Sequence, residues 1–236
     1  MQDFDIQGLL HDLSILALPV LIAITTHEAA HGFVAWRCGD DTAYQQGRVT
    51  FNPLKHIDPF GTVLLPLMLY FAHVGLFGWA KPVPISPRRF RNYRRDLILV
   101  AAAGPGSNLI LAVVSALLLH VAIHAPDWFA TWAVSALYYS IVINIVLAIF
   151  NMLPLLPLDG GRVLSAILPR HLAIAYQRTE RYGMLVLIGL IFLLPMLGRQ
   201  IGVDIDILGW ILGPASSYVR SLILQLTGAG DLLSLQ

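Results

Sequence analysis

Charged side chains and cysteine are both scarce in this chain. Only 12% of its 236 residues are charged, 57% are hydrophobic, and the mean hydropathy is +0.71. This composition excludes an ordinary soluble protein and is typical of a polytopic membrane protein, so we expect one intramembrane domain over residues 1–236. The single cysteine, Cys38, rules out an intrachain disulfide and a Cys-x-x-Cys metal site. The first 12 residues contain no Lys or Arg, so they lack the basic region of a cleavable signal peptide.

Long uncharged stretches are present instead, and they predict an all-α membrane protein. A helix needs about 20 mostly apolar residues to cross the hydrocarbon core of a bilayer. Four stretches qualify: residues 13–36, 97–121, 128–150 and 182–197. A fifth stretch, 207–226, is a possible span, because Pro214, two serines and Arg220 interrupt it.

Residues 60–77 are apolar but contain glycines, Pro66 and His73, so this segment is either re-entrant or spanning. The basic residues favour the re-entrant alternative, because 13 of them then face one side of the membrane. They are Arg37, Arg48, Lys55, Lys81, Arg88, Arg89, Arg91, Arg94, Arg95, Arg162, Arg170, Arg178 and Arg181. The positive-inside rule places this side in the cytoplasm and the N-terminus outside.

The arginines between residues 88 and 95 are interleaved with Phe90 and Tyr93. Because they lie between membrane segments, we expect them to contact acidic headgroups of the lipid bilayer and not nucleic acid.

One motif places ionisable groups inside an apolar span. His27-Glu28-Ala29-Ala30-His31 is an HExxH sequence, and Glu28 is the only charged residue between positions 13 and 36. Residues four apart share one face of a helix, so both imidazoles can reach a single metal ion. In metalloproteases the two histidines of this motif bind zinc and the glutamate is the general base. Ionisable residues within a span are costly and indicate function. The alternative is a pair of buried polar histidines satisfied by neighbouring helices.

Asp159 is the candidate for a third zinc ligand. Catalytic zinc usually has three protein ligands and one open position. The span over residues 128–150 runs in the same direction as the first span and delivers Asp159 to the depth of the histidines. Pro154, Pro157 and the glycine pair after Asp159 exclude an ordinary helix, and such backbone is tolerated at membrane depth only where protein or water satisfies it. The alternative is a helix cap or turn at the membrane exit.

Residues 46–52 predict a short β-hairpin beside the site. Gln46-Gly47 is turn-like, and the residues after it alternate in character. We expect either a membrane-associated hairpin whose edge pairs with an extended substrate by strand addition, or a plain surface hairpin. His56 and His73 could approach the metal, although such histidines are more often polar packing residues.

Taken together, these motifs resemble those of the site-2 protease family of intramembrane zinc metalloproteases. The family pairs HExxH on one helix with NxxPxxPLDG on another, and this chain has HEAAH and, starting at Asn151, NMLPLLPLDGG. The sequence AAGPGSN at residues 102–108 resembles the AGPxxN of the intervening helix. Residues 51–59 and 78–84 are similar to the compact bacterial and archaeal branch. The chain shows no insert of PDZ size between the core helices and no CBS pair.

The resemblance implies a specific site in a core of transmembrane helices, with broken helices around a buried metal. One zinc ion per chain would be bound by His27, His31 and Asp159, and Glu28 would be the catalytic base. Asn151 matches the family asparagine that helps to hold the substrate or the reaction intermediate. Asn108 matches the asparagine of the AGP segment and is also expected to bind substrate.

The predicted function is therefore that of an intramembrane zinc endopeptidase. It would cut a peptide bond within or next to the transmembrane segment of a single-span membrane protein. The alternative is a metal-ion transporter or channel that uses the same His/Asp cluster, although no paired internal repeat is visible. A catalytically silent scaffold is a third possibility, against which the intact HExxH motif and Asp159 argue.

Overall fold

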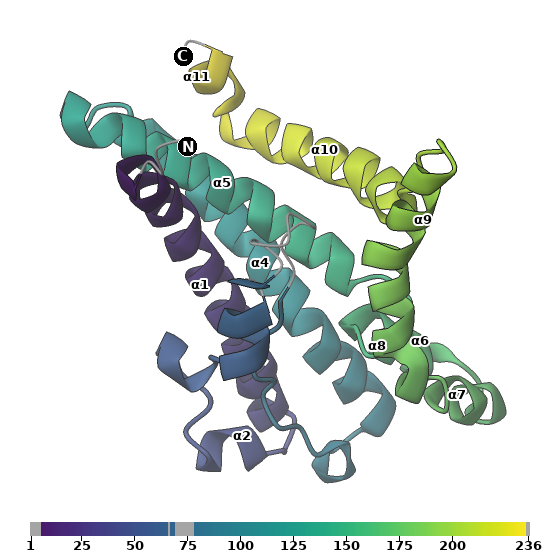
Figure 1. Ribbon diagram of the computed structural model, residues 1–236. Coiled ribbons are helices and arrows are strands. Elements are labelled where there is room, and N and C mark those ends of the chain that lie inside the picture. Colours follow the sequence, from purple (N-terminus) through teal and green to yellow (C-terminus); the bar gives the residue numbers. More distant parts are fainter. Residues whose placement is uncertain (1–5, 66, 69–77, 235–236) are drawn as a thin grey trace.

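The chain is mainly helical in the computed structural model, which describes residues 6–65, 67–68 and 78–234 (Figure 1). In chain order the α-helices are α1 (Ile6–Arg37), α2 (Thr42–Gln45), α4 (Tyr93–Ala122), α5 (Asp127–Asn151), α6 (Asp159–Ile167), α7 (Arg170–Gln177), α8 (Glu180–Ile188), α9 (Leu194–Gln200), α10 (Ile207–Thr227) and α11 (Gly230–Ser234). Short 3-10 or π turns lie between them: η1 (Pro53–Lys55), η2 (Pro59–Leu64), η3 (Pro87–Arg89) and η4 (Gly189–Leu193).

Five helical stretches are long and apolar enough to cross a membrane. They are Leu13–Arg37, Tyr93–Ala122, Asp127–Asn151, Glu180–Gln200 and Ile207–Thr227. Each matches a stretch predicted from the sequence to within a few residues, and the possible fifth span is the continuous helix α10 in spite of Pro214. The fourth stretch is one helix that contains the π turn η4 between α8 and α9. The prediction of an all-α, multi-pass membrane protein is confirmed.

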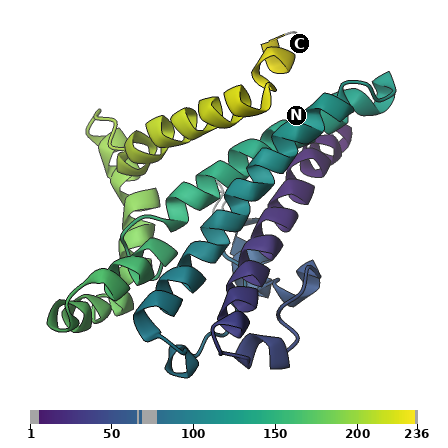
Figure 2. The same cartoon turned by 180° about the vertical axis from the view of Figure 1, so that it is seen from behind.

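Helices α1, α4 and α5 form the core and lie side by side in both ribbon views (Figures 1 and 2). Ala112 and Ala116 of α4 are fully buried in one cluster with Ile141 and Ile145 of α5. Such small side chains let helix backbones approach closely where lipid offers no hydrophobic driving force. Ile223 of α10 joins the same cluster, so α10 packs on α5 and α4.

The predicted β-hairpin at residues 46–52 is wrong. These residues are all described, and they form a turn and bends with no strand pairing. The N–H of Arg48 donates back to the carbonyl of Ala43, which closes the turn after α2. The buried guanidinium of Arg48 then donates to the carbonyl oxygens of Lys81, at 2.7 Å, and Pro82, at 3.3 Å. A side chain therefore fixes this segment, and the alternating residues have no strand to pair with.

The segment over residues 60–77 falls largely outside the described residues, which include neither 66 nor 69–77. Its flanks meet: the N–H of Trp79 donates to the carbonyl of Gly61 at 3.0 Å. Two residues further on, the N–H of Lys81 donates to the carbonyl of His56 at 2.9 Å. Residues 56–61 and 79–81 therefore lie side by side, and the re-entrant course of the segment stays a prediction.

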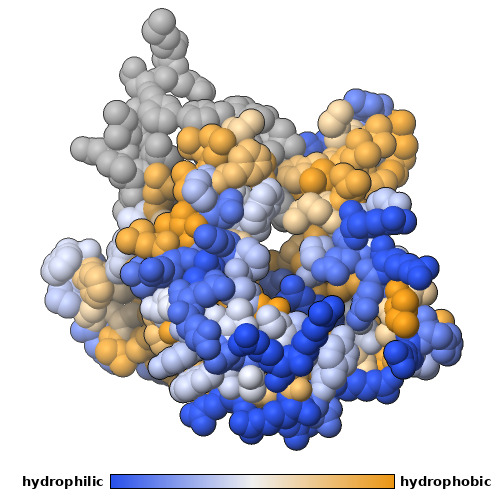
Figure 3. Space-filling model, turned by 90° about the horizontal axis from the view of Figure 1, so that it is seen from below, coloured by the Kyte–Doolittle hydropathy of each residue, from blue (hydrophilic) through white to orange (hydrophobic). Residues whose placement is uncertain are grey.

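One end of the molecule is strongly hydrophilic (Figure 3). Hydrophilic residues gather on the face seen from below, where α1 ends, α4 begins and α7 lies. Arg37 is the last residue of α1, η3 contains Arg88 and Arg89, and α7 begins with Arg170. Basic residues from all three predicted clusters therefore lie at the same end of the helix bundle.

Candidate metal centre and active site

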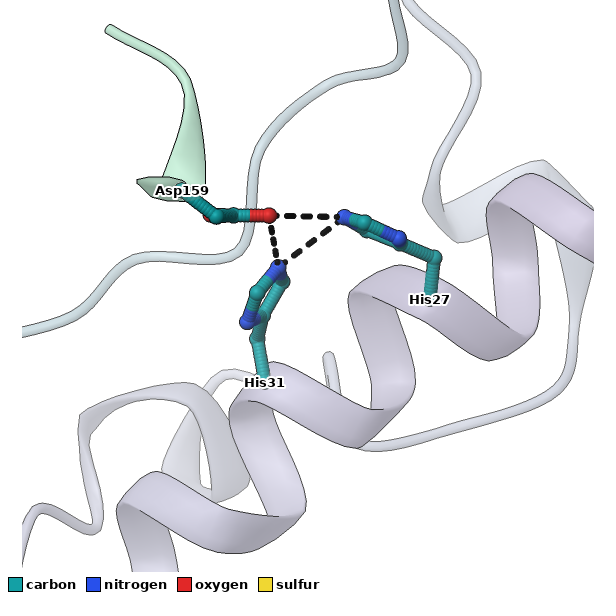
Figure 4. A group of neighbouring side chains, drawn as sticks. All are labelled: His27, His31 and Asp159. Atoms are coloured by element: carbon teal, nitrogen blue, oxygen red, sulfur yellow. Dashed lines mark hydrogen bonds and ion pairs between the residues drawn. The ribbon is translucent and has the colours of Figure 1, made fainter. Parts of the chain in front are cut away.

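Three potential metal ligands from distant parts of the chain meet in a buried cluster (Figure 4). His27 and His31 lie one turn apart on α1, and Asp159 is the first residue of α6. Oδ2 of Asp159 lies 3.2 Å from Nε2 of His27 and 3.2 Å from Nε2 of His31. The two Nε2 atoms are 3.0 Å apart. The structure thus brings together the three residues that the sequence singled out as ligands.

Hydrogen bonds behind the imidazoles determine which ring nitrogen carries the proton. Nδ1 of His31 lies 2.7 Å from the carbonyl oxygen of Val100, which can only accept. Nδ1 of His27 lies 2.6 Å from Oδ1 of Asn108, whose Nδ2 donates to the carbonyl of Ala23. Each Nδ1 therefore carries the proton, and each Nε2 presents a lone pair to the cluster.

This arrangement is suited to a cation. Two imidazole lone pairs and a carboxylate oxygen face one another, and Oδ2 of Asp159 is buried with no hydrogen-bond partner in the described part of the chain. Tetrahedral zinc, with ligands at about 2.0–2.2 Å, separates them by about 3.3 Å. The observed separations of 3.0 and 3.2 Å fit this spacing.

The local sequence explains how Asp159 reaches the histidines. Helix α5 ends at Asn151, and the chain turns through residues 152–158 before α6 begins. Pro154 within this turn lacks the N–H that a continuing helix would use. A Cβ at Gly160 would lie 2.1 Å from the carbonyl oxygen of Met152, so α6 can pack on the turn only with glycine at this position.

Gly104 in the AGP segment of α4 lies directly against the ligands. A Cβ at this position would be 2.4 Å from Nε2 of His31 and 2.6 Å from Nε2 of His27. Only glycine leaves room for both rings here. The sequence analysis quoted the AGP segment but assigned no role to this residue.

Glu28 is held beside the cluster by an extended segment, residues 78–84, which we call the strap. The N–H of Val83 in the strap donates to Oε2 of Glu28 at 2.7 Å. This bond fixes the orientation of the carboxylate next to His27, although the two partners are far apart in sequence.

Alternate amides of the strap point in the same direction. The N–H groups of Trp79, Lys81 and Val83 all donate to the rest of the protein. Ala80 lies between the first two of these, so its amide points the other way. Its N–H and C=O have no hydrogen-bond partner among the described residues. Within the described part of the chain, the strap therefore has one unpaired edge, at Ala80.

A cleft of about 210 Å³ opens beside the ligands. Its lining includes His27, Glu28, Ala80 and Asn151, and the remaining side chains are mostly apolar residues of α1, α5 and α8. The Nδ2 of Asn151 donates to the carbonyl of Leu147 at 3.0 Å, which holds the amide at the end of α5. The cleft is therefore mostly apolar where it adjoins His27 and Glu28, with Asn151 alongside.

A second cavity, of about 370 Å³, has a more polar lining. Val83 and Arg162 both line it, together with Gln177 and Glu180. Nη1 of Arg162 also lies 3.8 Å from Oδ1 of Asp159. We call it the polar cavity because its lining has a larger polar share than that of the first cavity, although most of its lining residues are apolar.

The structure places two other candidate residues outside the ligand cluster. Asn108, expected to bind substrate, is fully buried behind His27 and does not line the cleft. His56 is buried, with Nε2 3.0 Å from the carbonyl oxygen of Thr50, and is not one of the three clustered ligands. His73 lies outside the described residues.

The sequence analysis missed Asn144. Its Oδ1 accepts a hydrogen bond from Nδ2 of Asn108 at 2.8 Å, so it lies one step behind the metal ligand His27. The signal that could have found it is a buried polar side chain in the middle of an apolar span.

Known proteins with similar sequences carry the name of putative zinc metalloproteases. The model of peptidase family M50 matches residues 120–194, which include Asn151 and Asp159. "Putative zinc metalloprotease YwhC" of Bacillus subtilis is 41% identical over 186 residues, which cover 77% of this chain and 81% of that protein. "Putative zinc metalloprotease Rip2" of Mycolicibacterium smegmatis is 30% identical over 210 residues, which cover 88% of this chain and 77% of that protein. No solved structure matches the chain.

The similarity extends over most of both chains, and none of these names favours the transporter alternative. The ligand cluster has the donor atoms and the spacing that a zinc protease needs. The chain belongs to peptidase family M50, the site-2 protease family, and is a zinc metalloendopeptidase of the membrane.

Proposed function

We propose that this enzyme binds one zinc ion through His27, His31 and Asp159 and hydrolyses a peptide bond within or next to the transmembrane segment of a membrane protein. The observation that carries the proposal is the position of the candidate metal ligands within an apolar helix. Both histidines lie within a helix long and apolar enough to span a membrane, and the cleft beside them is mostly apolar. A protease site in this position suits a substrate that arrives through lipid.

Glu28 is the proposed general base. It lines the same cleft as His27, and Val83 orients its carboxylate. Bound zinc would polarise the scissile carbonyl and lower the pKa of water to about 7. Glu28 would accept the proton of the attacking water and then pass it to the leaving amine. The amide of Asn151 would donate to the substrate carbonyl, where negative charge develops.

The substrate has to be extended locally, because a helix hides its amides in its own hydrogen bonds. The unpaired edge at Ala80 can bind such a stretch by strand addition. This role replaces the one expected of residues 46–52, which form no strand. The polar cavity beside Arg162 would take the end of the substrate that leaves the apolar cleft.

The proposed orientation of the protein in the membrane follows from the distribution of its basic residues. The hydrophilic end that carries the basic clusters would face the cytoplasm, with the active site near that side and the N-terminus outside. The partners would be a single-span membrane protein and the lipid bilayer, with the arginines between residues 88 and 95 at the headgroups and no role for nucleic acid.

The experiment compares the native protein with Glu28→Gln and His31→Ala variants. Zinc content is measured on purified protein, and cleavage is followed by proteomics of membranes from cells that carry each form. We expect the Glu28→Gln variant to retain zinc, lose about 10²–10⁴-fold in rate and accumulate an uncut membrane-span fragment. The His31→Ala variant should lose zinc as well. Full activity of Glu28→Gln in protein free of contaminating protease, or zinc flux in liposomes without any cleavage, would overturn the proposal.

A further inference from the structure

A line of buried polar side chains runs from the metal ligands into the helix core. His27 is joined to Asn108 of α4, and Asn108 is joined to Asn144 of α5, at 2.6 and 2.8 Å. Both asparagines are fully buried. Neither lines the cleft or the polar cavity, so neither can touch a substrate there. Their role has to be exerted through His27 or through helix packing.

Backbone carbonyls determine the direction of every hydrogen bond in this line. Nδ2 of Asn144 donates to the carbonyl of Ser140 at 2.9 Å, and a carbonyl can only accept. The Oδ1 of Asn144 therefore faces Asn108, whose Nδ2 has to be the donor. The same Nδ2 also lies 3.3 Å from the carbonyl of Ala23. Only Oδ1 of Asn108 is then left for His27, and it accepts the proton on Nδ1.

The two bonds that orient Asn108 are unequal. The bond to Asn144, at 2.8 Å, is shorter than the one to Ala23, at 3.3 Å. A rotation of the Asn108 amide by 180° would turn Nδ2 toward His27 and require Nδ1 of His27 to accept. Nε2 would then carry the proton and could not bind a metal. Asn144 is the stronger of the two restraints against this rotation.

We propose that Asn144 is a positioning residue that holds His27 in its metal-binding tautomer by fixing the amide of Asn108. The inference rests on the proposed zinc site. It assigns a function in metal binding to a residue of α5 that does not contact the metal ligands. Partners of this kind, which act through a ligand, typically account for 10–100-fold in metal affinity.

The competing explanation is that the Asn108–Asn144 bond only joins α4 to α5. Hydrogen bonds between membrane helices contribute on average about 0.6 kcal/mol, so a purely structural loss would be small. It would lower thermal stability and leave zinc affinity unchanged. Metal affinity therefore separates the two explanations.

The experiment measures zinc affinity by chelator competition in purified, micelle-bound protein. The visible spectrum of the cobalt-substituted protein reports ligand geometry independently of activity. We expect Asn144→Leu, an apolar residue of similar size, to weaken zinc binding by about 10–100-fold and to change the cobalt spectrum.

Asn144→Asp should bind zinc almost as the native protein does. A fully buried aspartic acid stays neutral and can donate to Ser140 while accepting from Asn108. Tyr138→Phe is the control, because it removes a different hydrogen bond of α5, the 3.3 Å contact from Nη1 of Arg220, which is not part of the Asn108–Asn144 line.

A double-mutant cycle tests whether Asn144 acts on His27 through Asn108. If Asn144 acts through Asn108, Asn144→Leu should have no further effect on zinc affinity once Asn108→Ala is present. Should Asn144→Leu fail to fold, Asn144→Ala removes the same acceptor and is measured instead. Native zinc affinity and an unchanged cobalt spectrum in the folded variant would overturn the inference. Failure of the native protein to bind zinc would overturn the proposed function instead, so the two failures are distinct.

Discussion

The carboxylate of Glu28 accepts a hydrogen bond from the backbone N–H of Val83, 55 residues further along the chain, at 2.7 Å. Val83 belongs to the strap. Ala80, three residues earlier in the strap, has the unpaired edge and lines the cleft. The segment proposed to align the substrate therefore also orients the proposed base.

Replacement of Gly104 by alanine should weaken zinc binding, because the new Cβ would lie 2.4 Å from Nε2 of His31. We expect at least a 10-fold loss of zinc affinity, on the order found when ligand orientation is disturbed. Gly106→Ala is the control in the same helix, since a Cβ there meets nothing within 4 Å. Both changes raise helix propensity by about 1 kcal/mol, so that effect cancels. Equal zinc affinities in a chelator titration would contradict the role given to Gly104.

Zinc should stabilise the native protein and not an Asp159→Asn variant. The amide at position 159 removes the negative charge, and its N–H can donate to an imidazole lone pair in the absence of metal. Zinc at about 1,000 times its dissociation constant adds about 4 kcal/mol to the free energy of unfolding. Thermal unfolding with zinc and with chelator measures the effect. We expect a zinc-dependent rise in Tm for native protein alone, and a higher Tm for the chelated variant than for chelated native protein. A similar rise in both proteins would count against Asp159 as a ligand.

An Ala80→Pro substitution should slow cleavage without loss of zinc. Proline has no N–H and cannot donate from the strap edge to an extended substrate. The loss of one such bond corresponds to about a 10-fold effect on kcat/KM. Ala80→Gly keeps the N–H and serves as the control. Cleavage assays combined with zinc analysis distinguish the two variants, and unchanged cleavage by Ala80→Pro would exclude pairing at this edge.

The fully buried Asp40 should be far more important for stability than its neighbour Asp41. The Asp40 carboxylate accepts from the backbone and hydroxyl of Thr42 and from the backbone N–H of Ser86. An Asp40→Ala change leaves these donors without an acceptor and should cost about 2–3 kcal/mol. Asp41 pairs with Arg89 at the surface, so Asp41→Ala should cost about 1 kcal/mol or less. Denaturant unfolding in micelles compares them, and equal losses would refute this ranking.

Much of the fold could be predicted because its causes are local. Apolar stretches of sufficient length predicted all five spans, and even Pro214 did not alter that outcome, since α10 continues through it. The four-residue spacing of His27 and His31 predicted a shared helix face for the same reason. The prolines and glycines around Asp159 predicted a broken helix, and the common direction of the first and third spans placed it at the right depth.

The prediction failed where contacts over long sequence separations decide the structure. Residues 46–52 alternate like a strand, but Arg48 bonds to the carbonyls of Lys81 and Pro82 and leaves no strand for them to join. The contacts of Asn108 with His27 and Asn144 also depend on such packing, that of α1 against α4 and α5, so no local pattern predicts them.

The sequence by itself determined which helices can span a membrane and which residues are candidate metal ligands, because composition and helical spacing are properties of short stretches. Only the tertiary structure decided which nitrogen of His27 faces His31 and Asp159, what orients Glu28, and which edge of the strap has no partner among the described residues. Each of these depends on a hydrogen bond between residues brought together by the packing of separate elements, and no local pattern encodes such a bond.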